Sequence, residues 1–126
     1  MKLRILFRLF LLILALSSTH TARAEVVRQF DTVVRLQPDT TLDVTETIVM
    51  DFEGAQRHGI YRTIPVRYNR NGGKYSVYIK ILEVADDKGN AHSYSSSRDW
   101  SNLKIKIGDP DKYVSGVVTY RIRYTV

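Results

Sequence analysis

Apolar and polar side chains alternate along most of this chain, and this period of two residues constrains the fold more than any other feature. Successive side chains of a strand point to opposite faces of a sheet, so the period indicates half-buried β-strands. The C-terminal segment has the clearest pattern. One face of it collects the apolar residues Val118, Tyr120, Ile122, Tyr124 and Val126. No helical period competes with this pattern from residue 25 onward, which predicts an all-β domain.

Further strands are expected between turns rich in glycine, proline and aspartate. Their ranges are Phe30–Leu36, Thr41–Phe52, Tyr75–Ala85, His92–Ser96 and Asn102–Ile107. Apolar groups on both faces of Tyr75–Ala85 favour a central position for that strand. Short strands with such turns predict an antiparallel, immunoglobulin-like β-sandwich. Because the last strand still alternates at Val126, we expect the domain to be incomplete at its C-terminus.

Residues 1–24 have the order of a secretory signal peptide. Lys2, Arg4 and Arg8 precede an apolar run, and Ala22-Arg23-Ala24 has the pattern of an A-x-A cleavage site. The apolar run is too short for a membrane span, which needs about 20 residues. We therefore predict export across the cytoplasmic membrane and an extracytoplasmic domain at 25–126.

The net charge of the exported part is small. The whole chain has a net charge of +6, but four of its 19 basic residues and none of its 13 acidic residues lie in the predicted signal peptide. Residues 25–126 then have a net charge of +2, which gives no support for nucleic-acid binding. The chain also has no cysteine, which excludes disulfides, thiol nucleophiles and thiolate metal ligands.

Four motifs in a fixed order resemble a known family. They are Leu42-x-Val44-x-Glu46-x-Ile48, His58-Gly59-Ile60-Tyr61-Arg62-x-Ile64-Pro65, Lys106-Ile107-Gly108-Asp109 and Ser115-Gly116-x-x-x-Tyr120-x-Ile122-x-Tyr124. From about Phe30 to Val126 the chain is similar to the N-terminal domain of the YciQ-like family of predicted bacterial membrane proteins, a domain of unknown function. The resemblance implies a signal peptide, an extracytoplasmic β-domain, a transmembrane segment and a low-complexity tail. We expect this chain to be the front part, or a natural truncation, of such a protein.

Glu46 and Arg62 form the first candidate site. Glu46 lies on an otherwise apolar strand face, and a lone buried carboxylate is costly, so it needs a partner. Arg62 has Ile60 and Ile64 as same-side neighbours if its segment is extended. We predict a bidentate ion pair between them. A structural clamp that pins the 54–66 segment to the sheet is favoured over a ligand site.

A basic stretch forms the second candidate site. No acidic residue occurs from Gly54 to Leu82, where tyrosines alternate with basic residues. The candidate contacts to a polyanion are Arg57, Arg67, Arg70 and Lys74. Outside the cytoplasm such a surface would suit anionic lipid head groups or wall polymers. The alternative is a solvated face that acidic residues of neighbouring strands balance.

Enzymatic chemistry has little support in the sequence. His58 has no neighbouring nucleophile motif, and neither a Gly-x-Ser-x-Gly nor a His-Glu-x-x-His pattern occurs. We predict no catalytic residue, no metal site and no cofactor. The favoured function is an uncharacterised exported module, normally the ectodomain of a membrane-anchored protein, with an interaction or structural role. Its partner is not specified, but a membrane surface or another envelope protein is compatible. The alternatives are an envelope-acting hydrolase and a binder of anionic lipid or wall polymer through residues 57–80.

Overall fold

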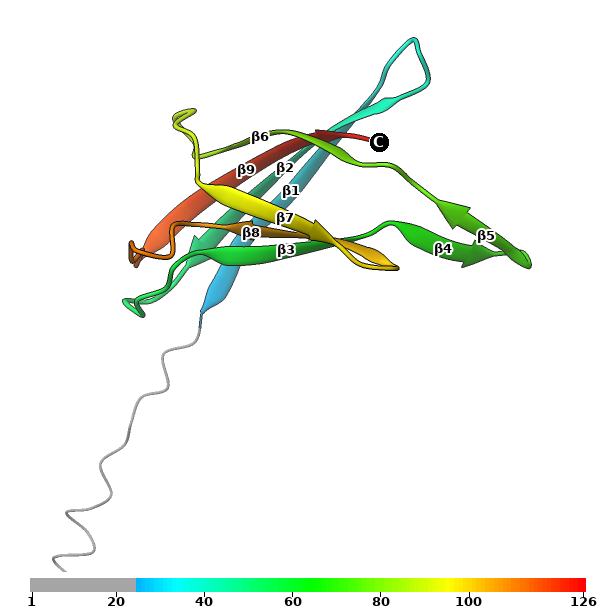
Figure 1. Cartoon of the computed structure of the whole chain (residues 1–126). Helices are drawn as coiled ribbons and strands as arrows, with labels where there is room; N and C mark the ends of the chain where they lie inside the picture. Colours follow the sequence, from blue (N-terminus) through cyan, green and yellow to red (C-terminus); the bar gives the residue numbers. More distant parts are fainter. Residues whose placement is uncertain (1–24) are drawn as a thin grey trace, which may run out of the picture.

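The computed structural model describes residues 25–126, so the predicted signal peptide at 1–24 lies outside the described residues. The described residues form nine strands and no helix (Figure 1). The strands are β1 (Val26–Leu36), β2 (Leu42–Asp51), β3 (Ile60–Pro65), β4 (Arg67–Arg70), β5 (Gly73–Ser76), β6 (Lys80–Ala85), β7 (Tyr94–Arg98), β8 (Asn102–Ile107) and β9 (Val117–Thr125). The all-β prediction is confirmed.

Two antiparallel sheets pack face to face, which confirms the predicted sandwich. One sheet has four strands in the order β1-β2-β9-β6, and the other has three in the order β3-β8-β7. Strands β4 and β5 pair only with each other and form a hairpin that projects beyond both sheets (Figure 1). This hairpin will be called the projecting hairpin.

The core lies between the two sheets and consists of the alternate residues that face inward from each strand. On β8 these are Leu103, Ile105 and Ile107, which are at most 5% exposed. The other members are Val44, Ile48, Phe52, Ile64, Val66, Ile79, Val84, Tyr120, Ile122 and Tyr124. The apolar faces predicted for the segments 41–52 and 118–126 are thus the faces that the sandwich buries.

The predicted central strand Tyr75–Ala85 is wrong. The segment contains two strands, β5 and β6, which belong to different sheets, and β6 lies at a sheet edge. Between them the chain crosses from the projecting hairpin to the sandwich, with Val77 N donating to Val66 O and Ile79 buried in the core. Leu82 is 42% exposed, so the apolar residues on both faces reflect the crossing and not burial on two sides.

Strand β1 has the alternation that was predicted but not the burial. Its residues Phe30, Thr32, Val34 and Leu36 pair with the core-facing residues of β2. The opposing sheet is one strand narrower, and all eleven residues of β1 remain exposed. Strand β1 therefore extends the four-stranded sheet beyond the core.

Asp51, at the end of β2, holds the base of β1 in place. Its carboxylate accepts a hydrogen bond from Glu53 N at 2.8 Å and one from Arg28 Nε at 2.8 Å. Arg28 lies at the bulge where the β1–β2 register shifts. These hydrogen bonds lower the pKa of Asp51 below its usual range, and the one from Glu53 N has the larger effect.

We predict that Asp51→Asn makes the folding stability less dependent on pH. A carboxylate with a lowered folded-state pKa stabilises the fold above its unfolded pKa of about 3.9, and this contribution is lost as the pH falls through the lower folded value. Urea unfolding should show the variant less stable than the unsubstituted protein at pH 7, with the two curves converging at acidic pH. Asp87→Asn, in an exposed turn, is the control and should leave the pH profile unchanged. Parallel curves for Asp51→Asn and the unsubstituted protein would contradict this role.

Candidate functional site

The structure brings Glu46 and Arg62 together between the two sheets. Glu46 projects inward from β2 and is 3% exposed, and Arg62 projects inward from β3. Arg62 Nε lies 2.7 Å from Glu46 Oε2, and Arg62 Nη2 lies 2.7 Å from Oε1, so the pair is bidentate. Tyr124 on β9 donates its hydroxyl to Glu46 Oε1 at 2.9 Å. Three strands from both sheets therefore meet at one carboxylate.

The remaining contacts of Arg62 favour a structural clamp over a ligand site. Its Nη1 donates to the Thr63 carbonyl at 2.7 Å, and its guanidinium lies 5.3 Å from the centre of the Phe30 ring. The hydrogen bond to Glu46 raises the pKa of Arg62, while burial and the Glu46 charge raise the pKa of Tyr124. Both oxygens of Glu46 already accept hydrogen bonds from the protein. The cluster thus satisfies its own charges without an external ligand.

Two glycines from two of the sequence motifs explain the geometry next to this clamp. Gly59 and Gly108 both have positive φ values, +135° and +131°. A Cβ at Gly59 would lie 1.8 Å from Ile107 O, and a Cβ at Gly108 would lie 1.7 Å from His58 O. The two backbones therefore touch where no side chain fits. This contact fixes the start of β3 and with it the direction of Arg62.

His58 lies on the outside of this turn. Its ring stacks on Tyr113 with centroids 4.3 Å apart, and its Nδ1 lies 3.1 Å from Lys112 O. A shallow cavity of about 470 Å³ beside it is lined by His58, Gly59, Ile60, Tyr61, Lys106, Ile107 and Pro110. This lining has neither a serine nor a carboxylate for a hydrolytic site. Within residues 25–126 no three histidine, aspartate or glutamate side chains cluster with the geometry of a metal site.

The projecting hairpin gathers three of the four basic residues predicted to contact a polyanion. Arg67 and Arg70 lie on β4, and Lys74 lies on β5. In the register of the hairpin Arg67 faces Ser76 and Asn69 faces Lys74, so Arg67 and Lys74 share one face. Arg70 is on the opposite face. The fourth residue, Arg57, lies outside the hairpin, where it forms an ion pair with Glu25.

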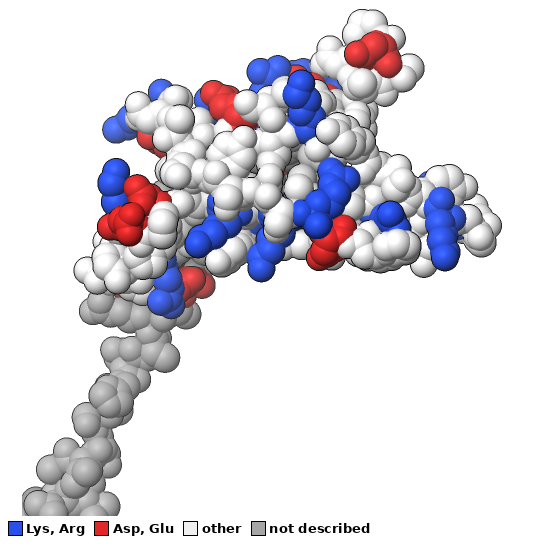
Figure 2. Space-filling view, in the orientation of Figure 1, with Lys and Arg blue, Asp and Glu red and all other residues white. Residues whose placement is uncertain are grey.

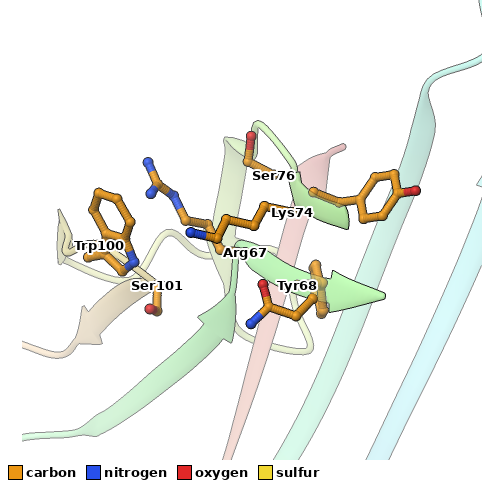
Figure 3. Close-up of a pocket in the computed structure, with 8 residues that line it drawn as sticks. Arg67, Tyr68, Lys74, Ser76, Trp100 and Ser101 are labelled. Atoms are coloured by element: carbon orange, nitrogen blue, oxygen red, sulfur yellow. The ribbon is translucent and has the colours of Figure 1, made fainter. Parts of the chain in front are cut away.

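Arg67 and Lys74 line a cavity of about 400 Å³ between the projecting hairpin and the β7–β8 turn, which we call the hairpin pocket. Trp100 belongs to that turn, and Figure 3 shows the side chains of Arg67 and Lys74 reaching toward it. The lining residues are Arg67, Tyr68, Asn69, Lys74, Tyr75, Ser76, Trp100 and Ser101. The Arg67 guanidinium lies 3.7 Å from the centre of the Trp100 ring, within cation–π range.

Asp99 is the acidic residue beside the hairpin pocket. It helps to line an adjoining cavity that shares Arg67 and Trp100 with the hairpin pocket. Its carboxylate accepts hydrogen bonds from Ser101 N and Asn102 N, both at 2.7 Å. These backbone hydrogen bonds lower the pKa of Asp99. The Asp99 carboxylate is thus engaged within the turn, and Arg67 stacks on the Trp100 indole. Arg67 and Lys74 therefore give the hairpin pocket two positive charges.

The two lysines of β8 are further exposed cations, beyond the four predicted to contact a polyanion. Lys104 and Lys106 are exposed on the outer face of the three-stranded sheet, opposite Thr63 and Tyr61 in the register with β3. Lys104 Nζ lies 4.5 Å from the centre of the Tyr61 ring. Figure 2 shows basic side chains following this side of the molecule from the sheet to the projecting hairpin. The alternation over 102–107 could have identified the pair, because it places both lysines on one face.

The fold and these surfaces define a β-sandwich domain with a buried ionic clamp and a basic, aromatic hairpin. Residues 26–126 match the family described as "Predicted membrane protein (DUF2207) N-terminal domain". The chain belongs to this family, which confirms the resemblance found in the sequence. Comparison with curated proteins and with solved structures gave no match. Within residues 25–126 no helix has the length and apolarity to cross a bilayer.

We predict that Arg62→Met lowers the free energy of unfolding by about 3–5 kcal/mol, because it leaves Glu46 buried without its counter-charge. The double variant Glu46→Gln, Arg62→Met should recover most of this loss, since the amide is neutral and can still accept from Tyr124. Chemical denaturation of both variants measures the difference. A double variant as unstable as the single one would contradict a clamp based on charge.

We predict that two hydroxyl groups on the same face of β9 contribute differently to the folding stability. Tyr124→Phe removes the donor to Glu46 and should cost about 1.5–3 kcal/mol. Tyr120 is buried, its hydroxyl has no hydrogen-bond partner among the described residues, and burial raises its pKa to about 12. Tyr120→Phe should therefore leave the stability unchanged or raise it by about 1 kcal/mol. Thermal unfolding of the two variants tests the contrast, and equal losses would contradict it.

Proposed function

We propose that the domain is a non-catalytic, extracytoplasmic interaction module that binds anionic phospholipid head groups through the hairpin pocket. The observation that supports this most directly is the convergence of Arg67 and Lys74 on the exposed ring of Trp100. Cations favour an anionic surface by about 1 kcal/mol each. Tryptophan and tyrosine suit the level of the head groups, where one side of the ring is apolar and the other is wet.

The shape of the projecting hairpin supports a lipid surface over a soluble polymer. It extends beyond both sheets and can reach a surface that the body of the sandwich does not touch (Figure 1). Its turn, Asn71-Gly72, is polar, so it would rest among head groups and not enter the hydrocarbon layer. Exposed aromatic rings flank the cations: Tyr68, Tyr75, Tyr78 and Trp100.

Membership in a family of predicted membrane proteins is consistent with a position close to a bilayer. The side of the membrane follows from the predicted signal peptide and is part of this proposal. The hydrolase alternative finds no support, because the cavity beside His58 is lined by neither a serine nor a carboxylate.

Vesicle co-sedimentation tests the proposal. The protein should bind vesicles that contain phosphatidylglycerol, should not bind phosphatidylcholine vesicles, and should dissociate as salt is added. Arg67→Gln with Lys74→Gln removes two cations, worth about 2 kcal/mol, so partitioning should fall about 30-fold. Lys88→Gln with Lys112→Gln is the matched control, because it makes the same change of net charge at exposed positions outside the hairpin.

Equal binding by the two double variants would contradict the hairpin pocket as the binding site. A second experiment measures binding of the protein to soluble polyphosphate, alone and in competition with the vesicles. It distinguishes a lipid head group from a soluble anionic polymer as the ligand. Retention of polyphosphate without any binding to anionic vesicles would indicate an anionic polymer of the envelope and would overturn the lipid assignment. Binding that salt does not weaken would contradict both.

A further inference from the structure

Strand β1 has an open edge along the side of the four-stranded sheet. It is the outermost strand, with β2 on one side and no described strand on the other. Proteins usually protect such an edge by keeping it short, by bulges, by charged side chains or proline, or by a covering segment. The single bulge of β1 lies near its start, between Val27 and Gln29. From Gln29 to Leu36 the strand has no further bulge and no proline. The two charged residues of this stretch, Asp31 and Arg35, are of opposite sign, so they do not repel a second copy of the strand.

Apolar side chains follow this open edge. Phe30, Val34 and Leu36, on the inner face, are 49%, 54% and 73% exposed. Val33, on the outer face, is 46% exposed. The narrower opposing sheet leaves this row exposed, although the Arg62 guanidinium of that layer lies 5.3 Å from the centre of the Phe30 ring. Burial of this row would be favourable, by roughly 25 cal/mol for each Å².

Two of the three charged residues of β1 are placed symmetrically about Val33, and the third, Arg28, is paired with Asp51. Asp31 lies two residues before Val33 and Arg35 lies two residues after it, on the same outer face. An antiparallel copy of a strand reverses its order, so each charge then faces its opposite. We propose that β1 pairs antiparallel with β1 of a second copy of this chain, with a two-fold axis at Val33, so that the two four-stranded sheets become one.

The register follows from the sequence of β1. With the axis at Val33, Asp31 faces Arg35 of the partner subunit, and the reverse pair occurs by symmetry. On the inner face Phe30 lies opposite Leu36 of the partner subunit, and Thr32 lies opposite the partner's Val34. Cross-strand pairs of opposite charge and of aromatic with aliphatic groups stabilise a sheet.

Neighbouring registers lose this match. An axis at Thr32 would place Asp31 opposite Val33 of the partner subunit, and an axis at Val34 would place Arg35 opposite the partner's Val33. Axes at Asp31 or Arg35 would place like charges directly opposite each other, which destabilises the pairing. The register at Val33 also uses the regular part of β1, between the bulge and the turn at Gln37.

The present contacts of the two charges leave them accessible. Asp31 accepts a hydrogen bond from Gln29 on its own strand, and both residues are exposed. Arg35 lies opposite Asp43 of β2, but the hydrogen bonds of Asp43 come from Arg123, with the nearer at 2.6 Å. Pairing would therefore add a partner to both Asp31 and Arg35 without breaking an ion pair of the fold.

A pair of charge variants at the axis tests both the dimer and its register. In sedimentation velocity the full chain should form a dimer. Val33→Glu and Val33→Lys each place like charges opposite each other, so the dissociation constant should rise about fivefold or more for each variant alone. An equimolar mixture should form a heterodimer, because the two introduced charges attract. Val33→Thr, with no charge, should dimerise like the unsubstituted chain.

Cross-linking provides a second measurement, because the chain has no native cysteine. Val33→Cys places two thiols opposite each other across the axis, with Cα atoms about 4.5–5.5 Å apart, within the range for a disulfide. Mild oxidation should give a covalent dimer. For Asp31→Cys the two thiols belong to residues offset by four positions, about 13 Å, so it should not cross-link within the dimer.

Several outcomes would overturn the proposal. They are a monomer at all concentrations, a dimer that both charge variants leave intact, and cross-linking at position 31 as efficient as at position 33. A charge variant that had failed to fold would not be rescued by mixing, so rescue separates loss of the interface from loss of the fold. A monomer that binds an unrelated strand at β1 would also count against a second copy as the occupant.

Discussion

The ion pair between Glu46 and Arg62 is the interaction on which the arrangement of the two sheets depends. A carboxylate that is 3% exposed requires donors. Glu46 projects from β2, and its donors come from Arg62 on β3 and Tyr124 on β9. The contact between Gly59 and Gly108 sets the start of β3, and the ion pair then sets how β3 lies over β2. The distinctive sequence motif at 58–65 therefore has a geometric explanation that requires no catalysis.

Four strands packed on three leave one strand without a counterpart, and this inequality leaves one side of the sandwich open. At one side it exposes the apolar row of β1. The second open surface is the projecting hairpin. After Pro65, the last residue of β3, the chain leaves the sandwich, forms this hairpin, and returns through Val77 to β6. The two candidate interaction surfaces thus lie on different elements, and neither requires a change in the core.

The sequence specifies the core well because burial on one face imposes a period of two. The inner rows of β2 and β9 follow directly from it. The pairing of Glu46 with Arg62 was predicted because each charge lies in an otherwise apolar row, Arg62 between Ile60 and Ile64. What alternation cannot specify is whether a second layer covers a given face, so the pattern predicts that one face of β1 is buried, whereas both faces are exposed. The same limit applies to Trp100, because its contact with Arg67 depends on how a turn and a hairpin, about 30 residues apart in the chain, meet in space.

The two strands of the projecting hairpin pair only with each other, so a change in the length of the hairpin would break no backbone pair of the two sheets. A segment that is decoupled from the core in this way can diverge freely among relatives, by insertion or by exchange of a few residues, while the ionic clamp and the glycine contact keep the scaffold unchanged. Different members could then recognise chemically different surfaces with one common body, and the hairpin would be the natural place to graft a new specificity.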